Sequence, residues 1–188
     1  MRKIKIVEHI SLDGVIEHGD FEYGAWTTPY RTPGGQTLLL EAYGPGFDLV
    51  LGRRTYDAWL NFWPNAGNFP MANGINKATK YVVTHRPESL SWGPVKDLGN
   101  DFTEGLRELR STEGHDLVIS GSISLTSVLL GAGLIDEVIL AVYPVLLGRG
   151  KRILADSFDA RELEFISTKT TPTGVLLNTY RHVGSLKK

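Results

Sequence analysis

The chain has 188 residues, of which 41% are hydrophobic, so it is long enough to form one domain with a substantial core. Its formal net charge is −1 and it has no basic stripe, so neither nucleic acid nor an anionic membrane is an expected partner. The absence of cysteine excludes disulfides, thiolate metal sites and cysteine nucleophiles, and it fits a cytoplasmic protein.

The first predicted strand covers Ile4–Ile10, and a turn follows it at Ser11–Gly14. Asp13 stands before a glycine in this turn, which is a common setting for simple turn chemistry. The alternative is an acid at a strand end that faces a cleft, so Asp13 is one of two candidate catalytic residues. The segment Glu17–Gly35 is irregular and aromatic, and two interpretations stay open: a lid over a flat ring, or a self-packed loop.

A phosphate site is predicted after the second strand. Gln36–Tyr43 is expected to form a short helix whose only acid, Glu41, is the other candidate catalytic residue. Phe47–Leu51 is a buried strand, and Tyr56–Leu60 begins the next helix. Between them lies Gly52-Arg53-Arg54-Thr55, a small residue followed by two guanidiniums and a hydroxyl. Arginine presents a planar fork that matches phosphate oxygens, and the helix dipole adds positive potential at the same place.

The middle of the chain supplies a second strand end with an arginine. Asn61–Ala78 is expected to be a loop, because it is rich in Asn, Gly and Pro. Lys80–Val83 is a strand, and the Thr84-His85-Arg86 turn after it offers a further phosphate contact. Val95–Leu98 is predicted as an edge strand and Phe102–Arg110 as an amphipathic helix. No pair of histidines or carboxylates has metal-ligand spacing, so no metal site is expected.

A strand, a small turn and a helix recur in the second half. Asp116–Ile119 is predicted as a strand, Ser120-Gly121-Ser122 as the turn and Ser124–Leu130 as the helix. A small residue at such a turn lets a phosphate approach the free N–H groups of the helix N-terminus. The alternative is a plain crossover connection. The next strand, Glu137–Val142, is ended by Pro144.

The C-terminal part is predicted to be antiparallel. Glu164–Thr170 and Val175–Arg181 form a hairpin, and Gly184–Lys188 is expected to be a flexible tail. Strand–helix alternation with such an end predicts an α/β fold. Its sheet would be mostly parallel and covered by helices on both faces. Residues 1–183 would form a single domain.

Three strand ends carry small or polar turns: Leu51/Gly52, Val83/Thr84 and Ile119/Gly121. In sheets of this kind, ligands bind beyond the carboxyl ends of the strands. Two of the three ends bear arginine, which suits a long ligand with several phosphates. A dinucleotide is the natural candidate, although the G-x-G-x-x-G fingerprint of the ordinary dinucleotide fold is absent.

A series of motifs, in this order, resembles one family: Ser11-Leu12-Asp13-Gly14, Leu51-Gly52-Arg53-Arg54-Thr55-Tyr56, Lys80-Tyr81-Val82-Val83-Thr84, Ile119-Ser120-Gly121-Ser122, Gly133-Leu134-Ile135-Asp136-Glu137-Val138 and Pro144-Val145-Leu146-Leu147-Gly148-Arg149-Gly150. The family is the dihydrofolate-reductase-like one, in the branch similar to the reductase domain of the bacterial riboflavin-synthesis deaminase-reductase. The likeness covers nearly the whole chain. It implies a three-layer α/β/α sandwich with a central mixed sheet, and NADPH lying across the carboxyl edge.

The resemblance also implies which residues bind the cofactor. They are Gly52, Arg53, Arg54 and Thr55 for the pyrophosphate and adenosine end, Thr84, His85 and Arg86 for the adenine ribose and its 2′-phosphate, and Gly121, Ser122, Ile123 and Leu125 for the pyrophosphate near the nicotinamide. The fixed positive charge suits the additional phosphate of NADP.

The implied activity is hydride transfer from NADPH to a small pterin- or pyrimidine-like substrate, as in 5-amino-6-(5-phosphoribosylamino)uracil reductase. Dihydrofolate reductase and a non-catalytic NADP-binding module are the alternatives. The chain departs from the family in two ways: it lacks the cysteines of the zinc deaminase half, and Glu41 is the only acid on the helix before the Gly52 turn. A homodimer is expected, formed by Val138–Tyr143 and the C-terminal hairpin.

Overall fold

An eight-stranded sheet runs through the computed structural model of the chain, which describes residues 1–17, 22–99, 101–154 and 158–187. Its strands are β1 (Ile4–Ser11), β2 (Phe47–Gly52), β3 (Lys80–Val83), β4 (Val95–Asp97), β5 (Asp116–Ile119), β6 (Glu137–Tyr143), β7 (Arg161–Thr170) and β8 (Leu176–Ser185). The α-helices in the described ranges are α1 (Pro33–Tyr43), α2 (Arg53–Phe62), α3 (Pro70–Lys77), α4 (Phe102–Ser111) and α5 (Ile123–Gly131).

The strand order is β4-β3-β2-β5-β1-β6-β8-β7. Every neighbouring pair from β4 to β6 is parallel, whereas β8 runs antiparallel to both β6 and β7. The prediction of a mostly parallel sheet with an antiparallel C-terminal hairpin is therefore confirmed. The edge strand expected near Val95 is also confirmed, because β4 lies at one end of the sheet.

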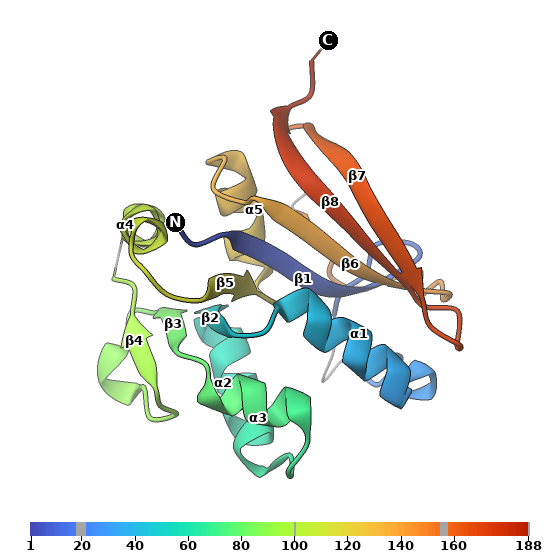
Figure 1. The fold of residues 1–188 in the computed structure, drawn as a ribbon, viewed down its shortest axis with the longest axis horizontal. Helices are drawn as coiled ribbons and strands as arrows, with labels where there is room; N and C mark the ends of the chain where they lie inside the picture. Colours follow the sequence, from blue (N-terminus) through green and yellow to red (C-terminus); the bar gives the residue numbers. More distant parts are fainter. Residues whose placement is uncertain (18–21, 100, 155–157, 188) are drawn as a thin grey trace.

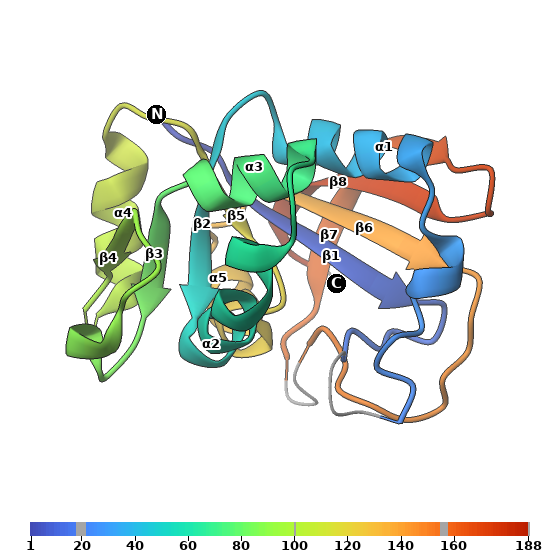
Figure 2. The same cartoon turned by 90° about the horizontal axis from the view of Figure 1, so that it is seen from below.

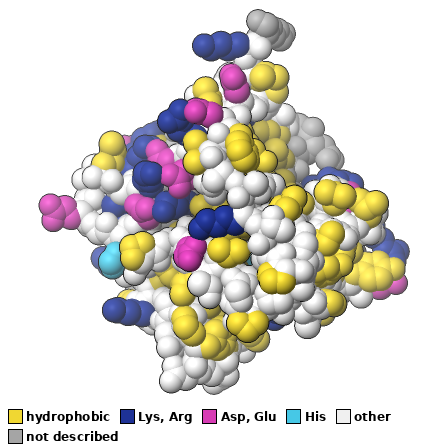
Figure 3. Space-filling model, turned by 45° about the vertical axis from the view of Figure 1, so that its right-hand side comes forward, with side chains coloured by type: hydrophobic (Ala, Val, Ile, Leu, Met, Phe, Trp, Pro, Cys, Tyr) yellow, Lys and Arg dark blue, Asp and Glu magenta, His cyan; other side chains and the backbone are white. Residues whose placement is uncertain are grey.

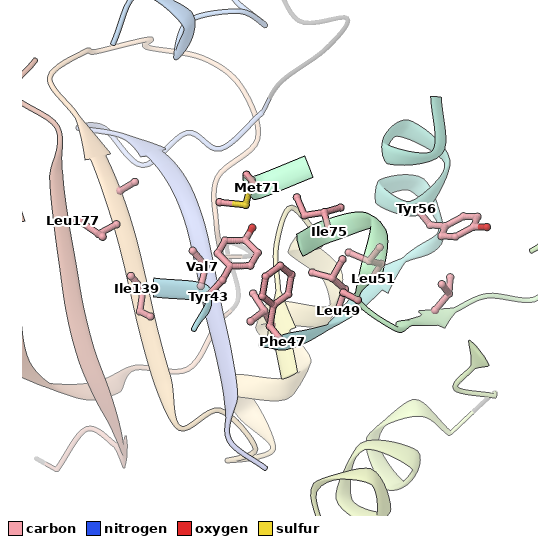
Figure 4. Close-up of a cluster of buried hydrophobic side chains, with 14 of the residues drawn as sticks. Val7, Tyr43, Phe47, Leu49, Leu51, Tyr56, Met71, Ile75, Ile139 and Leu177 are labelled. Atoms are coloured by element: carbon pink, nitrogen blue, oxygen red, sulfur yellow. The ribbon is translucent and has the colours of Figure 1, made fainter. Parts of the chain in front are cut away.

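Helices cover both faces of the parallel part of the sheet. One buried cluster joins the sheet to α1, α2 and α3 through Tyr43, Tyr56 and Ile75. Figure 4 shows Ile75 beside Leu49, with Tyr43 and Tyr56 on opposite sides of the group. A second cluster joins α4 and α5 to the other face through Leu106 of α4 and Leu129 of α5. Figure 1 shows the same division, with α1–α3 on one side of the sheet and α4 and α5 on the other. This confirms the three-layer sandwich, in which strands buried on both faces are continuously apolar.

The prediction of a loop over Asn61–Ala78 is wrong. The segment contains α3, which begins with Pro70 at its first position. Proline is tolerated there because the first N–H of a helix has no intrahelical partner. Met71, Ala72 and Ile75 form one buried face of this short helix. Asn and Gly at the other positions of α3 masked this spacing in the sequence.

The hairpin is longer than predicted. β7 starts at Arg161 rather than Glu164, and β8 continues through Gly184 to Ser185. Gly184 pairs with Glu162, so the expectation of a flexible tail from residue 184 is wrong for its first two residues. β6 lies inside the sheet between β1 and β8, so it has no free edge for pairing with a second chain. β7 is the edge strand at this end.

The aromatic segment expected at Glu17–Gly35 packs against the sheet where the structure describes it; its residues 18–21 lie outside the described residues. Trp26 is buried, and its indole N–H donates to the Glu17 carbonyl (2.9 Å). The segment contains a 3-10 turn at Thr28–Tyr30 before α1 starts. Of the helices described here, none combines the length and the apolar character needed to cross a membrane.

Candidate functional site

The three predicted turns lie side by side at one edge of the sheet. β3, β2 and β5 are consecutive neighbours and run parallel, so their carboxyl ends meet there. Gly52 is in register with Val83, and Val50 with Ile119. The arrowheads in Figure 2 mark this edge. The structure therefore brings together the strand ends that the sequence assigned to one ligand.

The turns after β2 and β5 are interlocked by hydrogen bonds. The Gly52 N–H donates to the Ser122 hydroxyl oxygen (2.9 Å), and the Thr55 hydroxyl donates to the Gly121 carbonyl (3.1 Å). Gly121 has a φ of 69°, and a Cβ atom there would lie 3.2 Å from Thr55 Cγ2. Only glycine meets both the conformation and the close approach without strain.

Both helices that begin at this edge have N-termini without a side-chain cap. Gly52 is the N-cap of α2 and has no side chain, and Ser122 is the N-cap of α5 but makes no capping bond. By contrast, Thr32 caps α1 (3.0 Å to Gly35 N) and Asp101 caps α4 (3.1 Å to Glu104 N). The first N–H groups of α2 and α5 are therefore directed at the same edge, where they favour an anion.

Two arginines share one carboxylate beside these helix ends. Arg53 binds Asp57 with both Nε and Nη2 (2.9 Å each), and the nearest Arg86–Asp57 separation is 3.8 Å. Arg53 also donates to the Ser89 hydroxyl (2.5 Å), which ties α2 to the turn after β3. Arg54 is exposed at the first turn of α2. Arg86 makes only this longer contact with Asp57 and its side chain is 63% exposed, so its guanidinium can still bind phosphate.

The remaining predicted binding residues divide into exposed and buried ones. His85 is exposed, whereas Thr84 is buried and its hydroxyl oxygen accepts the Arg86 N–H (3.0 Å). Ile123 is the first residue of α5. Leu125 lies in the core against the Gly52 turn, so it supports the turn from inside.

The two candidate catalytic acids occupy structural positions. The Asp13 carboxylate accepts bonds from the Ser11 hydroxyl (2.6 Å) and from the N–H groups of Leu147 and Gly148 (3.1 and 2.7 Å). These bonds, the Ser11 one foremost, lower the pKa of Asp13 to about 2, so it is ionised at neutral pH. Glu41 is exposed and pairs with Lys169 on β7 (2.8 Å). The geometry favours a supporting role for both.

Sequence reasoning missed a third acid. Glu8 on β1 is 3% exposed, and the Gly121 N–H donates to its carboxyl group. Burial raises the pKa of Glu8 to about 8, and the bond from Gly121 opposes the rise. The available signal was an acid at an inward position of an apolar strand.

An aromatic group at the ends of β1 and β6 was also missed. Pairing between β1 and β5 stops at Ile6, whereas β1 continues beside β6 to Tyr143. Tyr143 is bonded to His9 (Nδ1 to hydroxyl oxygen, 2.8 Å), and the rings of Trp26 and Tyr30 meet it edge-on at 5.1 and 5.6 Å. Burial raises the pKa of Tyr143 to about 12, so its hydroxyl stays protonated at neutral pH. The group joins residues from distant segments, which no local motif marks.

A cavity of about 350 Å³ lies elsewhere, at the amino ends of β1 and β6. Lys3, Asp136, Arg181 and His182 are among the residues that line it. It is on the opposite edge of the sheet from the interlocked turns. We therefore place the candidate site at the carboxyl edge, where anion-binding groups converge.

Known proteins resemble this chain along nearly its full length. A sequence profile of the RibD C-terminal domain matches residues 2–177. The uncharacterized protein YyaP of Bacillus subtilis (strain 168) is 26% identical over 188 residues, covering 97% of this chain and 96% of YyaP. A crystal structure of a Shewanella sp. PV-4 protein with a provisional riboflavin-biosynthesis name has a TM-score of 0.71 at 20% identity, covering 96% of this chain and 99% of that one.

The fold extends to folate enzymes. Dihydrofolate reductase from Enterococcus faecalis, in complex with NADP(H), has a TM-score of 0.61 at 17% identity and covers 96% of both chains. At such identities the structural likeness shows the shared fold, and the profile match shows the family. The chain belongs to the RibD C-terminal domain family, with the fold of the dihydrofolate-reductase-like proteins.

Proposed function

We propose that the chain is an NADPH-dependent reductase of the riboflavin-synthesis type, similar to 5-amino-6-(5-phosphoribosylamino)uracil reductase. One observation carries the proposal. Two helix N-termini without side-chain caps, interlocked through Gly52 and Ser122, face the same edge as the Arg53–Asp57–Arg86 group. This combination fits a ligand with several phosphates.

Different residues of the chain would bind different parts of NADPH. The N–H groups at the starts of α2 and α5 hold the diphosphate, and Arg54 and Arg86, both exposed, meet the additional phosphate that distinguishes NADPH from NADH. When bound, NADPH supplies the hydride. The role of the protein is to orient the cofactor against the substrate and to limit access of water.

The substrate surface is proposed to be the aromatic group beside β1 and β6. Tyr30 and His9 are partly exposed and could contact a ligand, whereas Trp26 and Tyr143 are buried and hold them in place through ring contacts and the His9–Tyr143 bond. Aromatic side chains with a polar tip suit a flat heterocycle, such as a pyrimidine or a pterin. Hydride would pass to a C=N or C=O carbon of that ligand. The family membership and the provisional riboflavin-biosynthesis name of the Shewanella protein support this substrate class.

Cofactor and substrate are tested separately. The four tryptophans report binding when NADPH or NADH is titrated and fluorescence is recorded. We expect NADPH to bind at least tenfold more tightly than NADH, and equal weak binding of both would refute the proposal. NADPH oxidation is then measured with 5-amino-6-(5-phosphoribosylamino)uracil and with dihydrofolate. Turnover of the first supports the proposed activity, turnover of dihydrofolate alone reassigns the enzyme, and tight binding without turnover indicates a non-catalytic module.

We also propose a homodimer that forms through the β7–β8 hairpin. Phe165, Ile166 and Val183 are 58%, 50% and 52% exposed, which is unusual for apolar side chains on neighbouring strands. Figure 3 shows hydrophobic side chains near the C-terminus on this side of the molecule. β7 is an edge strand with charges of both signs, including Arg161 and Glu164, and a twofold contact is self-complementary.

A further inference from the structure

A buried carboxyl group lies directly behind the Gly121 turn. Glu8 is on β1, in register with Leu140 of β6, and its carboxyl group accepts the Gly121 N–H on the side of β5. The residue after Gly121 is the N-cap of α5. The Gly121 N–H therefore points inward at Glu8, and the N–H groups at the start of α5 are the ones left for a ligand.

The charged groups on the elements around Glu8 are engaged with other partners. On β1, Lys5 pairs with Asp116 (2.8 Å), at the far end of β5. On β6, Glu137 pairs with Lys3 (2.6 Å), also at the far end. The α5 sequence, ISLTSVLLG, contains no ionisable side chain. None of these groups is placed to neutralise the Glu8 carboxylate.

Two further titratable groups belong to the faces next to Glu8. Tyr43, at the end of α1, has its pKa raised to about 12, mainly by burial and further by Glu8. His9 alternates with Glu8 along β1 and bonds to Tyr143 on the face that packs against α1. Neither of these two groups is an arginine or a lysine. A negative charge on Glu8 would thus face both desolvation and any anion at the start of α5.

We propose that Glu8 is a positioning residue that must carry a proton when the cofactor diphosphate lies at the start of α5, so that NADPH binding takes up one proton at alkaline pH. The inference rests on the proposed function. The protonated carboxyl keeps its bond to the Gly121 N–H and holds the turn in its left-handed conformation. The ionised carboxylate would repel the diphosphate across the same turn.

The expected linkage has a definite direction. Burial raises the pKa of Glu8 to about 8, so the group is mostly protonated at pH 7 and contributes little to the pH dependence of NADPH binding there. Above pH 8 the free protein loses this proton and must regain it on binding. The dissociation constant for NADPH then rises by up to about tenfold per pH unit, the limit for one linked proton. The 2′-phosphate titrates near pH 6, below this window.

Proton uptake is measured first on the unmodified protein, which avoids any effect of mutation on folding. Titration calorimetry with NADPH at pH 9, in buffers with different ionisation enthalpies, gives the number of protons taken up. We expect close to one proton at pH 9 and close to none at pH 7. Equal uptake at the two pH values would overturn the inference.

The variant Glu8→Gln tests whether Glu8 is the residue that takes up the proton on NADPH binding. Glutamine keeps an oxygen that accepts the Gly121 N–H but cannot ionise, so NADPH affinity should stay flat from pH 7 to 9.5. The matched control is Glu104→Gln, which changes an exposed acid of α4 paired with Arg107 (3.0 Å) and should keep the slope of the unmodified protein. Lys80, whose pKa burial lowers to about 8, titrates in the same range but is unchanged in both variants. A slope that persists in Glu8→Gln overturns the inference.

A ligand-free measurement separates this inference from the proposed function. The carboxylic C=O stretch of Glu8, taken as the infrared difference between the unmodified protein and Glu8→Gln, should disappear as pH rises through about 8. If NADPH fails to bind at any pH, the proposed function is wrong. ADP-ribose, whose diphosphate diester has no titratable proton near pH 9, is then titrated in the same calorimeter and decides the linkage alone: uptake of one proton supports it and no uptake overturns it.

Discussion

The parallel half of the sheet and the antiparallel hairpin differ in how much of their surface is buried. β2 is buried along nearly its whole length between two layers of helices, and the turns at the carboxyl edge are fixed by side-chain hydrogen bonds. β7 and β8 have ten residues each, and every residue of β7 is at least partly exposed. Exposed apolar patches often mark interaction sites, in line with the dimer proposed through this hairpin. The proposed cofactor site and the proposed dimer contact thus lie on different halves of the sheet.

The largest expected effect concerns the stability of the parallel half against pH. Because burial raises the pKa of Glu8 from 4.5 to about 8, the folded protein holds a proton that the unfolded chain releases between these values. The free energy of unfolding should therefore fall by up to about 1.4 kcal/mol per pH unit between pH 5 and 8. Denaturant unfolding at several pH values tests this. Glu8→Gln should remove the slope, and if it does not, another group is responsible.

The second prediction separates backbone strain from ligand binding. Gly121 and Gly133 have nearly equal positive φ angles, 69° and 67°, but a Cβ atom at Gly133 would meet nothing within 4 Å. Replacing either glycine by alanine should cost about 1–2 kcal/mol of stability, because both conformations disfavour a side chain. Only Gly121→Ala should also weaken NADPH binding, by tenfold or more, as measured by tryptophan fluorescence. Equal NADPH affinities of the two variants would show that Gly121 is not part of the cofactor site.

The third prediction concerns the charge at the carboxyl edge. Arg86→Ala should weaken NADPH binding by about tenfold, the equivalent of one charge-assisted hydrogen bond, while NADH affinity stays within a factor of two. Arg107→Ala, on the exposed face of α4, is the matched control. A similar loss of affinity for NADPH and NADH would mean that Arg86 does not bind the additional phosphate.

The smallest effect on folding is expected in the hairpin. Phe165→Ser changes a side chain that is 58% exposed, so the free energy of unfolding at the level of one chain should change by less than about 0.5 kcal/mol. The same change should shift the sedimentation of the protein from dimer towards monomer. If the unmodified protein already sediments as a monomer at micromolar concentration, the exposed apolar side chains have another purpose.

Sequence reasoning worked where the information is local. The strand–turn–helix units at Gly52 and Gly121 follow from a run of apolar residues, a glycine and a helix start. It failed for α3, where Asn and Gly obscured a face of Met71, Ala72 and Ile75. It also missed Glu8 and Tyr143, because their significance depends on neighbours more than 100 positions away. Glu8 and Tyr143 become buried and find these hydrogen-bond partners only when distant segments of the chain are brought together by folding.

The position of β1 has a consequence for how the protein is made. In chain order β1 precedes the other strands of the sheet, yet both of its neighbours, β5 and β6, come from the second half of the chain. Parallel pairing across such long separations is slow, because the intervening loop must close before the contacts form. During synthesis β1 therefore stays unpaired until β5 and β6 have been made, and as an exposed apolar segment it can form wrong contacts. Lys5 and Glu8 interrupt that apolar run, so the acid that supports the finished site also adds charge to the nascent strand.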